Sequence, residues 1–268
     1  MFRDLPEPRH EPLPQAPVQL VVWQLQFAEP ADIVPPAVGT TFQERLAHDS
    51  GGPFQLQRLT GQTLAISFPA PSGQGVPQAE PAPIEGWSLR RGPLAVTLNR
   101  QSLSVETNAY ETWASFRSVV DLAVQALGEA VLLPGEQRLG LRYVDRIVHP
   151  GVRKLDDWTD LLAPWLIGPL AHPHLRDAVG AYAQQVDFDA QADGIRATLR
   201  QRAFADAEQR GRQTVILDYD VFREGYRLIE ADATLVTTDK MHDLAHRLFE
   251  ASITEPLYNA FTKEPEGA

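Results

Sequence analysis

Hydrophobic and polar residues alternate along much of this chain, and a period of two is typical of strands with one buried face. The segment 18–27 (VQLVVWQLQF) is rich in β-branched, aromatic and other apolar residues, so we expect the first strand there. A turn near Asn99 separates two strands expected within 87–107. The same pattern predicts strands over 54–59, 63–68, 138–148, 181–190, 194–204 and 213–222.

Two segments instead carry apolar residues every three to four positions, the spacing of a helix with one buried face. The first is expected over 109–130, where Asn108 and Glu111 have the spacing of a capping box. The second is expected over 239–253. The buried faces should comprise Trp113, Phe116, Val120, Ala123, Leu127 and Ala130 in the first helix, and Met241, Leu244, Ala245, Leu248, Phe249 and Ile253 in the second; shorter helical pieces are expected near Thr41, with Phe42 and Leu46, and around 158–162.

Strands followed by a helix occur twice along the chain, which predicts an α+β fold of mainly antiparallel strands. We expect two sheet-plus-helix lobes, 18–150 and 151–262, each with its strands covered by one long helix. The repeated order suggests an internal duplication. The proline-rich residues 1–17 are expected to form an extended arm, 69–83 a low-complexity loop, and 263–268 a disordered tail.

The composition narrows the classes of protein to consider. The 268 residues include no cysteine, which excludes disulfides, thiolate catalysis, iron–sulfur clusters and cysteine-ligated zinc. The net charge of −11 argues against binding to a nucleic acid backbone. The charged N-terminus is unlike a signal peptide, and no run approaches the roughly 20 apolar residues that cross a bilayer. We therefore expect an acidic, cytoplasmic protein without a cofactor or a membrane partner.

Several segments together resemble a sporadically distributed bacterial family of uncharacterised proteins of similar length. The most specific are the Y-x-x-W-x-x-F segment that begins at Tyr110 and the strand segment 141–147 (LRYVDRI), and the likeness extends from about Pro17 to Phe261. In that family the position of Asp145 is often asparagine. The resemblance implies no activity, but the sporadic distribution implies a mobile or defence-linked genetic context.

His242 and His246 lie four residues apart in the second predicted helix, so both side chains can face the same way and bind zinc. Glu250 follows one turn later as a third candidate ligand. Zinc hydrolases with this spacing carry a glutamate directly after the first histidine as general base, whereas this chain has Asp243. Two alternatives follow, a metal-dependent hydrolase and a polar flank of the buried helix face. We favour the second, with no bound metal and no catalytic residues.

Two predicted strands each carry a pair of aspartates on one side. Asp187 and Asp189 form one pair, and Asp218 and Asp220 form the other. Paired strands can gather such carboxylates around a cation such as Mg²⁺. The alternative is an outer sheet face on which these carboxylates meet cross-strand arginines, at Arg196, Arg200 and Arg202.

Arg138, Arg142 and Arg146 recur at alternate positions of one strand face. Guanidinium groups in such a row can bind carboxylates of a partner or a ligand. The alternative is a set of internal ion pairs, for which Asp218 and Asp220 are the candidate acceptors. We take Arg142 as the best binding candidate because it lies in the family-like segment.

Trp158 and Trp165 lie in a stretch rich in proline and glycine. Exposed aromatic side chains there would suit a protein interface, and buried ones a small satellite core. Together with the arginine row they favour a non-enzymatic interaction protein, such as a neutralising or accessory partner of another protein. Two alternatives stay open: the metal-dependent hydrolase, and a small-ligand binder with its ligand between sheet and helix.

Overall fold

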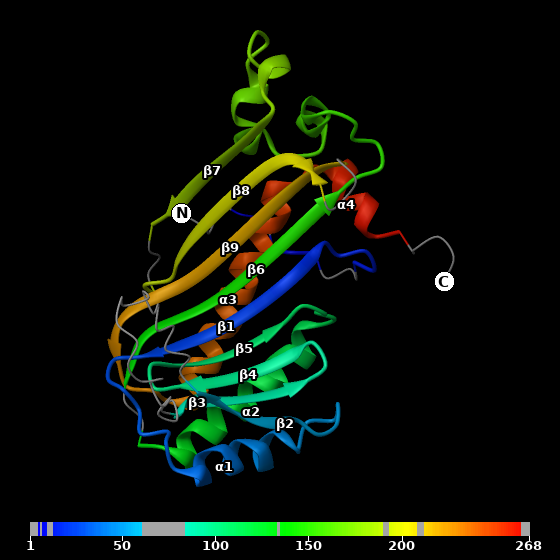
Figure 1. Cartoon of the computed structure of the whole chain (residues 1–268). Helices are drawn as coiled ribbons and strands as arrows, with labels where there is room; N and C mark the ends of the chain where they lie inside the picture. The colour runs from blue at the N-terminus through cyan, green and yellow to red at the C-terminus, as the bar shows by residue number, and fades with distance from the viewer. Residues whose placement is uncertain are drawn as a thin grey trace, which may run out of the picture.

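A computed structural model describes residues 5, 7–9, 13–60, 84–132, 135–189, 193–207 and 212–263 of the chain. Its strands form one sheet of nine in the order β2-β3-β4-β5-β1-β6-β9-β8-β7, and every neighbouring pair is antiparallel (Figure 1). The strands are β1 (Val18–Phe27), β2 (Gln55–Thr60), β3 (Ile84–Arg91), β4 (Leu94–Asn99), β5 (Ser102–Thr107), β6 (Glu136–Val148), β7 (Ala181–Phe188), β8 (Arg196–Asp206) and β9 (Arg212–Arg227).

The α-helices of the described residues are α1 (Pro36–Leu46), α2 (Trp113–Ala130), α3 (Ala231–Ser252) and α4 (Glu255–Phe261). The two long ones, α2 and α3, each follow the strands of one half of the chain. Between β6 and β7 the chain forms the short 3-10 turns η2 (Leu155–Asp160), η3 (Pro164–Leu166), η4 (Gly168–Ala171) and η5 (Arg176–Ala178).

Strands β1 and β6 lie next to each other in the middle of the sheet and join the two halves of the chain. Trp23 of β1 lies opposite Leu141 of β6 in their antiparallel register. The α+β class and the antiparallel pairing are therefore confirmed. The two expected lobes do not form separate sheets, because β6 pairs with β1 on one side and with β9 on the other.

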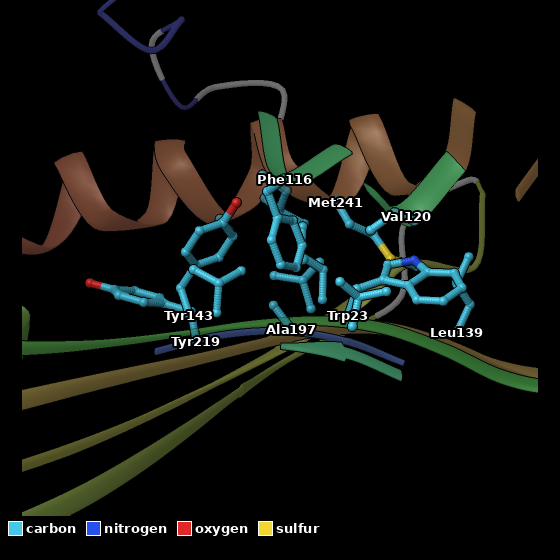
Figure 2. Packing of buried hydrophobic residues seen from close by; sticks show 14 of the residues in the cluster. Trp23, Phe116, Val120, Leu139, Tyr143, Ala197, Tyr219 and Met241 are labelled. Carbon is cyan, nitrogen blue, oxygen red and sulfur yellow. The ribbon is translucent and has the colours of Figure 1, made fainter. Parts of the chain in front are cut away.

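Helices α2 and α3 cover the same face of the sheet (Figure 1). Helix α3 crosses β6 and β9, while α2 packs beside it against β5 and α1. Trp23 and Leu139 from the sheet meet Val120 of α2 and Met241 of α3 in the buried layer between them (Figure 2). The indole N–H of Trp23 donates a 3.0 Å hydrogen bond to Thr238 Oγ1, so this buried polar group is satisfied.

The helix predicted over 109–130 is present as α2, but its predicted capping box is wrong. The side chain of Thr112 caps α2 by accepting a 3.2 Å hydrogen bond from the backbone N–H of Ser115. Asn108 and Glu111 precede this cap. In the same segment the Tyr110 ring packs edge-on against Tyr143 of the core, with 5.7 Å between the ring centroids. The predicted buried face is confirmed at Phe116, Val120, Ala123 and Leu127, while Trp113 and Ala130 are half-buried.

Helix α3 begins at Ala231, eight residues before the predicted start at 239. Its first turns contain threonines, whose branched side chains favour strands in a sequence-based prediction. Here Thr237 and Thr238 donate hydrogen bonds of 2.8 and 2.9 Å to the carbonyl oxygens of Ala233 and Thr234, one turn earlier. These bonds satisfy the hydroxyl groups inside the helix. The predicted apolar face from Met241 onward is buried as expected.

The segment 84–107 forms three strands rather than the two expected within 87–107. The extra turn is at Gly92, whose φ of 55° lies in the region that glycine adopts without steric cost. The predicted strand 63–68 and the loop 69–83 lie outside the described residues, as do 264–268 of the tail. Strand β2 pairs with β3.

No helix in the described part of the chain combines the length and the apolar character needed to cross a membrane.

Replacing Phe116 with Ala should lower the free energy of unfolding by about 3–5 kcal/mol, because this ring is only 4% exposed and truncation leaves a cavity. Chemical unfolding monitored by circular dichroism measures the change. Ser118→Ala on the exposed side of the same helix is the control and should shift stability by less than about 0.5 kcal/mol. Equal unfolding midpoints for the two variants would contradict this packing.

Candidate functional site

A cavity of about 270 Å³ lies between the sheet and α3, close to the first residue of β1 and the first turn of α2. Strands β6 and β9 form its floor, α3 its roof, and the segment before β1 one of its sides. Both halves of the chain therefore contribute to it. The residues that line it are Leu13, Ala16, Pro17, Val18, Tyr110, Glu111, Thr112, Trp113, Tyr143, Asp145, Tyr219, His242, Ala245, His246 and Phe249.

The floor of this pocket is aromatic. Tyr143 and Tyr219 face each other across the register of β6 and β9 and point to the helix side of the sheet (Figure 2). Figure 2 shows their hydroxyl groups at one end of the apolar core, away from Trp23. Burial raises the pKa of both tyrosines above the ordinary value, so both hydroxyls stay protonated.

A carboxyl group, that of Asp145, also lies on this buried side. Alternation along β6 places Leu141, Tyr143, Asp145 and Ile147 on the helix-facing surface. Asp145 is 2% exposed, and its Oδ1 has no hydrogen-bond partner among the described residues. Burial raises the pKa of Asp145 to about 7. The pocket therefore contains an acid whose charge changes near neutral pH.

His242 forms part of the roof. Its ring stacks on Trp113 with 4.2 Å between centroids and 7° between planes, and a 2.9 Å hydrogen bond joins its Nδ1 to the Tyr143 hydroxyl. Burial, together with the neighbouring His246, lowers the pKa of His242 to about 4. At neutral pH the imidazole is uncharged. The contacts with Trp113 and Tyr143 fix its orientation.

The three candidate metal ligands on α3 do not converge. His242 turns toward Tyr143, whereas His246 Nε2 lies 3.4 Å from Glu250 Oε1. That glutamate also accepts a 2.7 Å hydrogen bond from the backbone N–H of Arg9. Within the described ranges, no three histidine, aspartate or glutamate side chains come together in a group that could hold a metal ion. Both histidines nevertheless line the pocket.

The described part of the predicted N-terminal arm packs against the C-terminal helices. The Arg9 guanidinium lies 3.8 Å from the centre of the Tyr258 ring and 2.8 Å from Glu255 Oε2. The backbone N–H of Gln15 donates a 3.1 Å hydrogen bond to the Phe261 carbonyl. These contacts hold Leu13 and the following residues against α3, where they close one side of the pocket.

Arg138, Arg142 and Arg146 share one sheet face, as predicted, but it is the face away from the helices. Each forms an ion pair with a carboxylate of the sheet. Arg142 binds Asp218 through two hydrogen bonds of 2.7 and 2.8 Å. The other pairs are Arg138 with Asp220, at 2.7 Å, and Arg146 with Asp206. These contacts match the alternative of internal ion pairs. That the arginines also bind a carboxylate of a partner or a ligand stays a prediction.

The predicted aspartate pairs lie in the same charged layer. Asp218 is also 3.6 Å from Arg200, and Asp187 accepts a 2.8 Å hydrogen bond from Thr198 Oγ1. These contacts match the outer-face alternative, with Arg200 as a cross-strand partner.

Trp158 and Trp165 have different surroundings. Trp158 is fully buried in the core, which matches the satellite-core alternative. Trp165 is 40% exposed, and its Nε1 donates a 2.9 Å hydrogen bond to the Ala251 carbonyl. The structure does not bring these two residues together with the arginine row.

The sequence patterns did not identify Asp145, Tyr143 and Tyr219 as site residues. A usable signal was present in β6, because Asp145 occupies a position whose neighbours at i−2 and i+2, Tyr143 and Ile147, are apolar or aromatic. A carboxyl at such a position must be buried if the strand is amphipathic.

Comparison with models of known protein families and with curated protein sequences found no match to this chain.

A double-mutant cycle on Arg142 and Asp218 should give a coupling free energy of about 0.5–1 kcal/mol, because solvent screens the half-exposed guanidinium. The cycle compares Arg142→Ala, Asp218→Ala and the double variant by chemical unfolding. Strictly additive losses would show that the pair does not contribute to stability.

Replacing Asp145 with Asn should stabilise the protein relative to wild type as the pH rises. The pKa of Asp145 is about 7 in the folded chain against an ordinary 3.8, so the folded state binds more protons between these values. Wild-type stability therefore falls as pH increases through this window. Between about pH 5 and about pH 8 the variant should gain about 2–3 kcal/mol over wild type.

Unfolding measured across this pH range tests the expectation. The matched control is Asp243→Asn, because Asp243 is exposed on α3. Its difference from wild type should stay flat with pH. A flat difference for Asp145→Asn as well would mean that the Asp145 carboxyl ionises normally.

Proposed function

We propose that this chain is a small-molecule-binding protein and that the pocket between the sheet and α3 is its site. The observation that carries this proposal is the buried Asp145 carboxyl, whose Oδ1 lacks a hydrogen-bond partner on the wall of the cavity. Buried polar groups in folded proteins are almost always satisfied. A ligand that donates a hydrogen bond to this oxygen would supply the missing partner.

The size and lining of the pocket support this proposal. Its volume of about 270 Å³ is close to the lower end, about 300 Å³, of ordinary ligand sites, and well above the roughly 150 Å³ cavity that holds benzene. Aromatic walls with a few polar groups are typical of sites for small organic molecules. A ligand with one ring and a short polar side chain fits these dimensions.

The energetics of Asp145 support the same conclusion. An ionised, unpaired carboxylate at 2% exposure costs folding free energy, and the chain would be more stable with an apolar or amide side chain there. Perturbed acids of this kind cluster at functional sites. Every aspartate of the arginine row, by contrast, has a cationic neighbour.

The protein-interaction function favoured by the sequence stays a prediction. Its strongest supports were the arginine row and the tryptophans, and these arginines have internal ion pairs while Trp158 is buried. The metal-dependent hydrolase also stays a prediction, and the separate directions of His242 and Glu250 do not favour it. The small-ligand alternative is the one for which the structure offers a cavity.

We also infer that the two halves of the chain arose by duplication, and the strand order supports this. In the first half the meander β2-β3-β4-β5 returns to pair its last strand with β1. In the second half β7-β8-β9 returns to pair its last strand with β6. A long helix follows each meander. Superposition of β1–α2 on β6–α3 tests this idea, and unlike helix placement would refute it.

Filling the pocket should abolish ligand binding. Ala245 lines the roof on α3, so Ala245→Leu puts three further carbon atoms into the cavity at a stability cost of no more than about 1–3 kcal/mol. The probes are phenethylamine, 2-phenylethanol and 3-phenylpropanoate, three one-ring compounds of different charge. Saturation-transfer NMR and thermal shift should detect saturable binding of at least one of them to wild type and none to the variant.

The matched control is Ala233→Leu, which makes the same change at an exposed position of α3 and should leave binding intact. If Ala245→Leu does not fold, Ala16→Phe blocks the pocket from the arm, outside the core. The proposed function is wrong if no probe binds wild type, or if binding survives in the blocked variants.

A further inference from the structure

We infer that the ligand of this pocket is a small organic cation, a primary or substituted amine on an aromatic or compact apolar body, with its ammonium group held by the Asp145 carboxylate. The inference rests on the proposed binding function and adds the chemical class of the ligand. The charges of the pocket, its aromatic surfaces and the position of its one deeply buried carboxyl group carry the inference.

The ionisable groups on the pocket wall favour a positive charge. Among the described residues, the lining contains no lysine and no arginine, and it contains two carboxyl groups, those of Glu111 and Asp145. His242 is neutral at physiological pH because burial lowers its pKa to about 4. An anionic ligand would meet Asp145 without a lysine or arginine to compensate it, and His246 already lies 3.4 Å from Glu250, so the wall selects against carboxylates and phosphates.

The chain as a whole adds to this selection. Its net charge of −11 attracts cations and repels anions at longer range. The cations that lie nearest the pocket in the sequence are already neutralised. The ion pairs are Arg9 with Glu250 and Glu255, Arg117 with Asp239, Arg247 with Glu7 and, on the opposite face of the sheet, Arg142 with Asp218 and Arg146 with Asp206.

The aromatic side chains give a cation a second kind of contact. Tyr110, Tyr143 and Tyr219 bring three aromatic rings to the wall of the cavity, and Tyr110 stands edge-on to Tyr143 at 88°. An ammonium or methylated ammonium group is attracted to the faces of such rings. Trp113 adds a further ring, although one of its faces is covered by His242.

Binding of a cation at Asp145 should be coupled to the release of a proton from its carboxyl group. In the empty pocket its pKa of about 7 leaves the carboxyl largely protonated below neutral pH. A bound ammonium group favours the ionised form and therefore displaces that proton. The other ionisable groups around the pocket are Tyr110, Tyr143, Tyr219, His242, His246 and Glu111. The three tyrosines stay protonated and His242 stays neutral between pH 5 and 8, so these four do not mask the Asp145 proton.

The test uses the full chain and two near-isosteric probes, phenethylamine and 2-phenylethanol, with 3-phenylpropanoate as the anion. At about pH 8 isothermal titration should show the amine binding at least about tenfold more tightly than the alcohol, and no binding of the carboxylate. Asp145→Asn should weaken the binding of the amine at least about tenfold and change the affinity for the alcohol less than about threefold. Asp243→Asn, an exposed change on α3, should alter neither.

Proton release provides an independent readout. Titrations of the amine at about pH 6 in buffers of different ionisation enthalpy should show close to one proton released per amine bound by wild type, and about half as much or less by Asp145→Asn. If His246 were the source of the proton, Asp145→Asn would release as much as wild type, and this outcome would overturn the role given to Asp145.

The results distinguish this inference from the proposed function. Suppose that Ala245→Leu loses binding, but wild type binds the amine and the alcohol equally well or binds the carboxylate more tightly. The proposed binding function would then stand, and the inference that the ligand is a cation would be overturned. Binding of none of the three probes would overturn both. An amine preference that survives in Asp145→Asn would overturn the assignment of the ammonium group to Asp145.

Discussion

The antiparallel pairing of β1 with β6 is the interaction on which the rest of the structure depends. It joins a five-strand half, β2 to β1, to a four-strand half, β6 to β7, in one continuous sheet. It also brings the start of β1 beside Asp145 of β6, since Val18 and Asp145 are register partners. The N-terminal segment, the first turn of α2 and the middle of α3 all meet at this place. The pocket therefore exists because two distant parts of the chain share one sheet.

The buried carboxyl groups on the two faces of the sheet differ in whether a cation lies beside them. On the outer face, arginines and aspartates of neighbouring strands form ion pairs, in which each buried or half-buried carboxylate has a guanidinium close by. On the inner face most of the strand residues that α2 and α3 cover are apolar, and the buried Glu136 there is paired with Arg223. Asp145, unlike Glu136, has no cationic neighbour among the described residues, and it lies on the wall of the pocket. This contrast is the physical reason for assigning binding to the inner pocket and stability to the outer row.

Much of the fold could be predicted from the sequence because its apolar periodicity is regular. The strand Val18–Phe27 has the predicted bounds, and the buried stripe of α3 from Met241 to Phe249 is as expected, with Ile253 buried just after the end of the helix. The start of α3 was missed because Thr234, Thr237 and Thr238 favour a strand locally, whereas in the folded chain the hydroxyls of Thr237 and Thr238 donate to carbonyl oxygens one turn earlier in the helix. The single sheet was missed because a local pattern does not say which strands of two halves become neighbours.

The site was harder to predict for a similar reason. His242 and His246 were identified from their spacing, but spacing does not reveal that Tyr143 and Trp113 fix the first of them. The arginine row was placed correctly on one face, and its carboxylate partners Asp218 and Asp220 were foreseen as an alternative. The proposed function rests on Asp145, but its role in a pocket could not be predicted from the sequence, because it depends on two features of the tertiary structure. It lies under α3, and a cavity lies beside it.

The most direct test of this account is the ionisation of Asp145 itself, followed by carboxyl ¹³C NMR with its signal assigned from the spectrum of Asp145→Asn. The account predicts a titration midpoint of about 7 in the empty protein, which falls by at least about one unit when phenethylamine saturates the pocket. A midpoint close to the ordinary 3.8, unmoved by the amine, would contradict it.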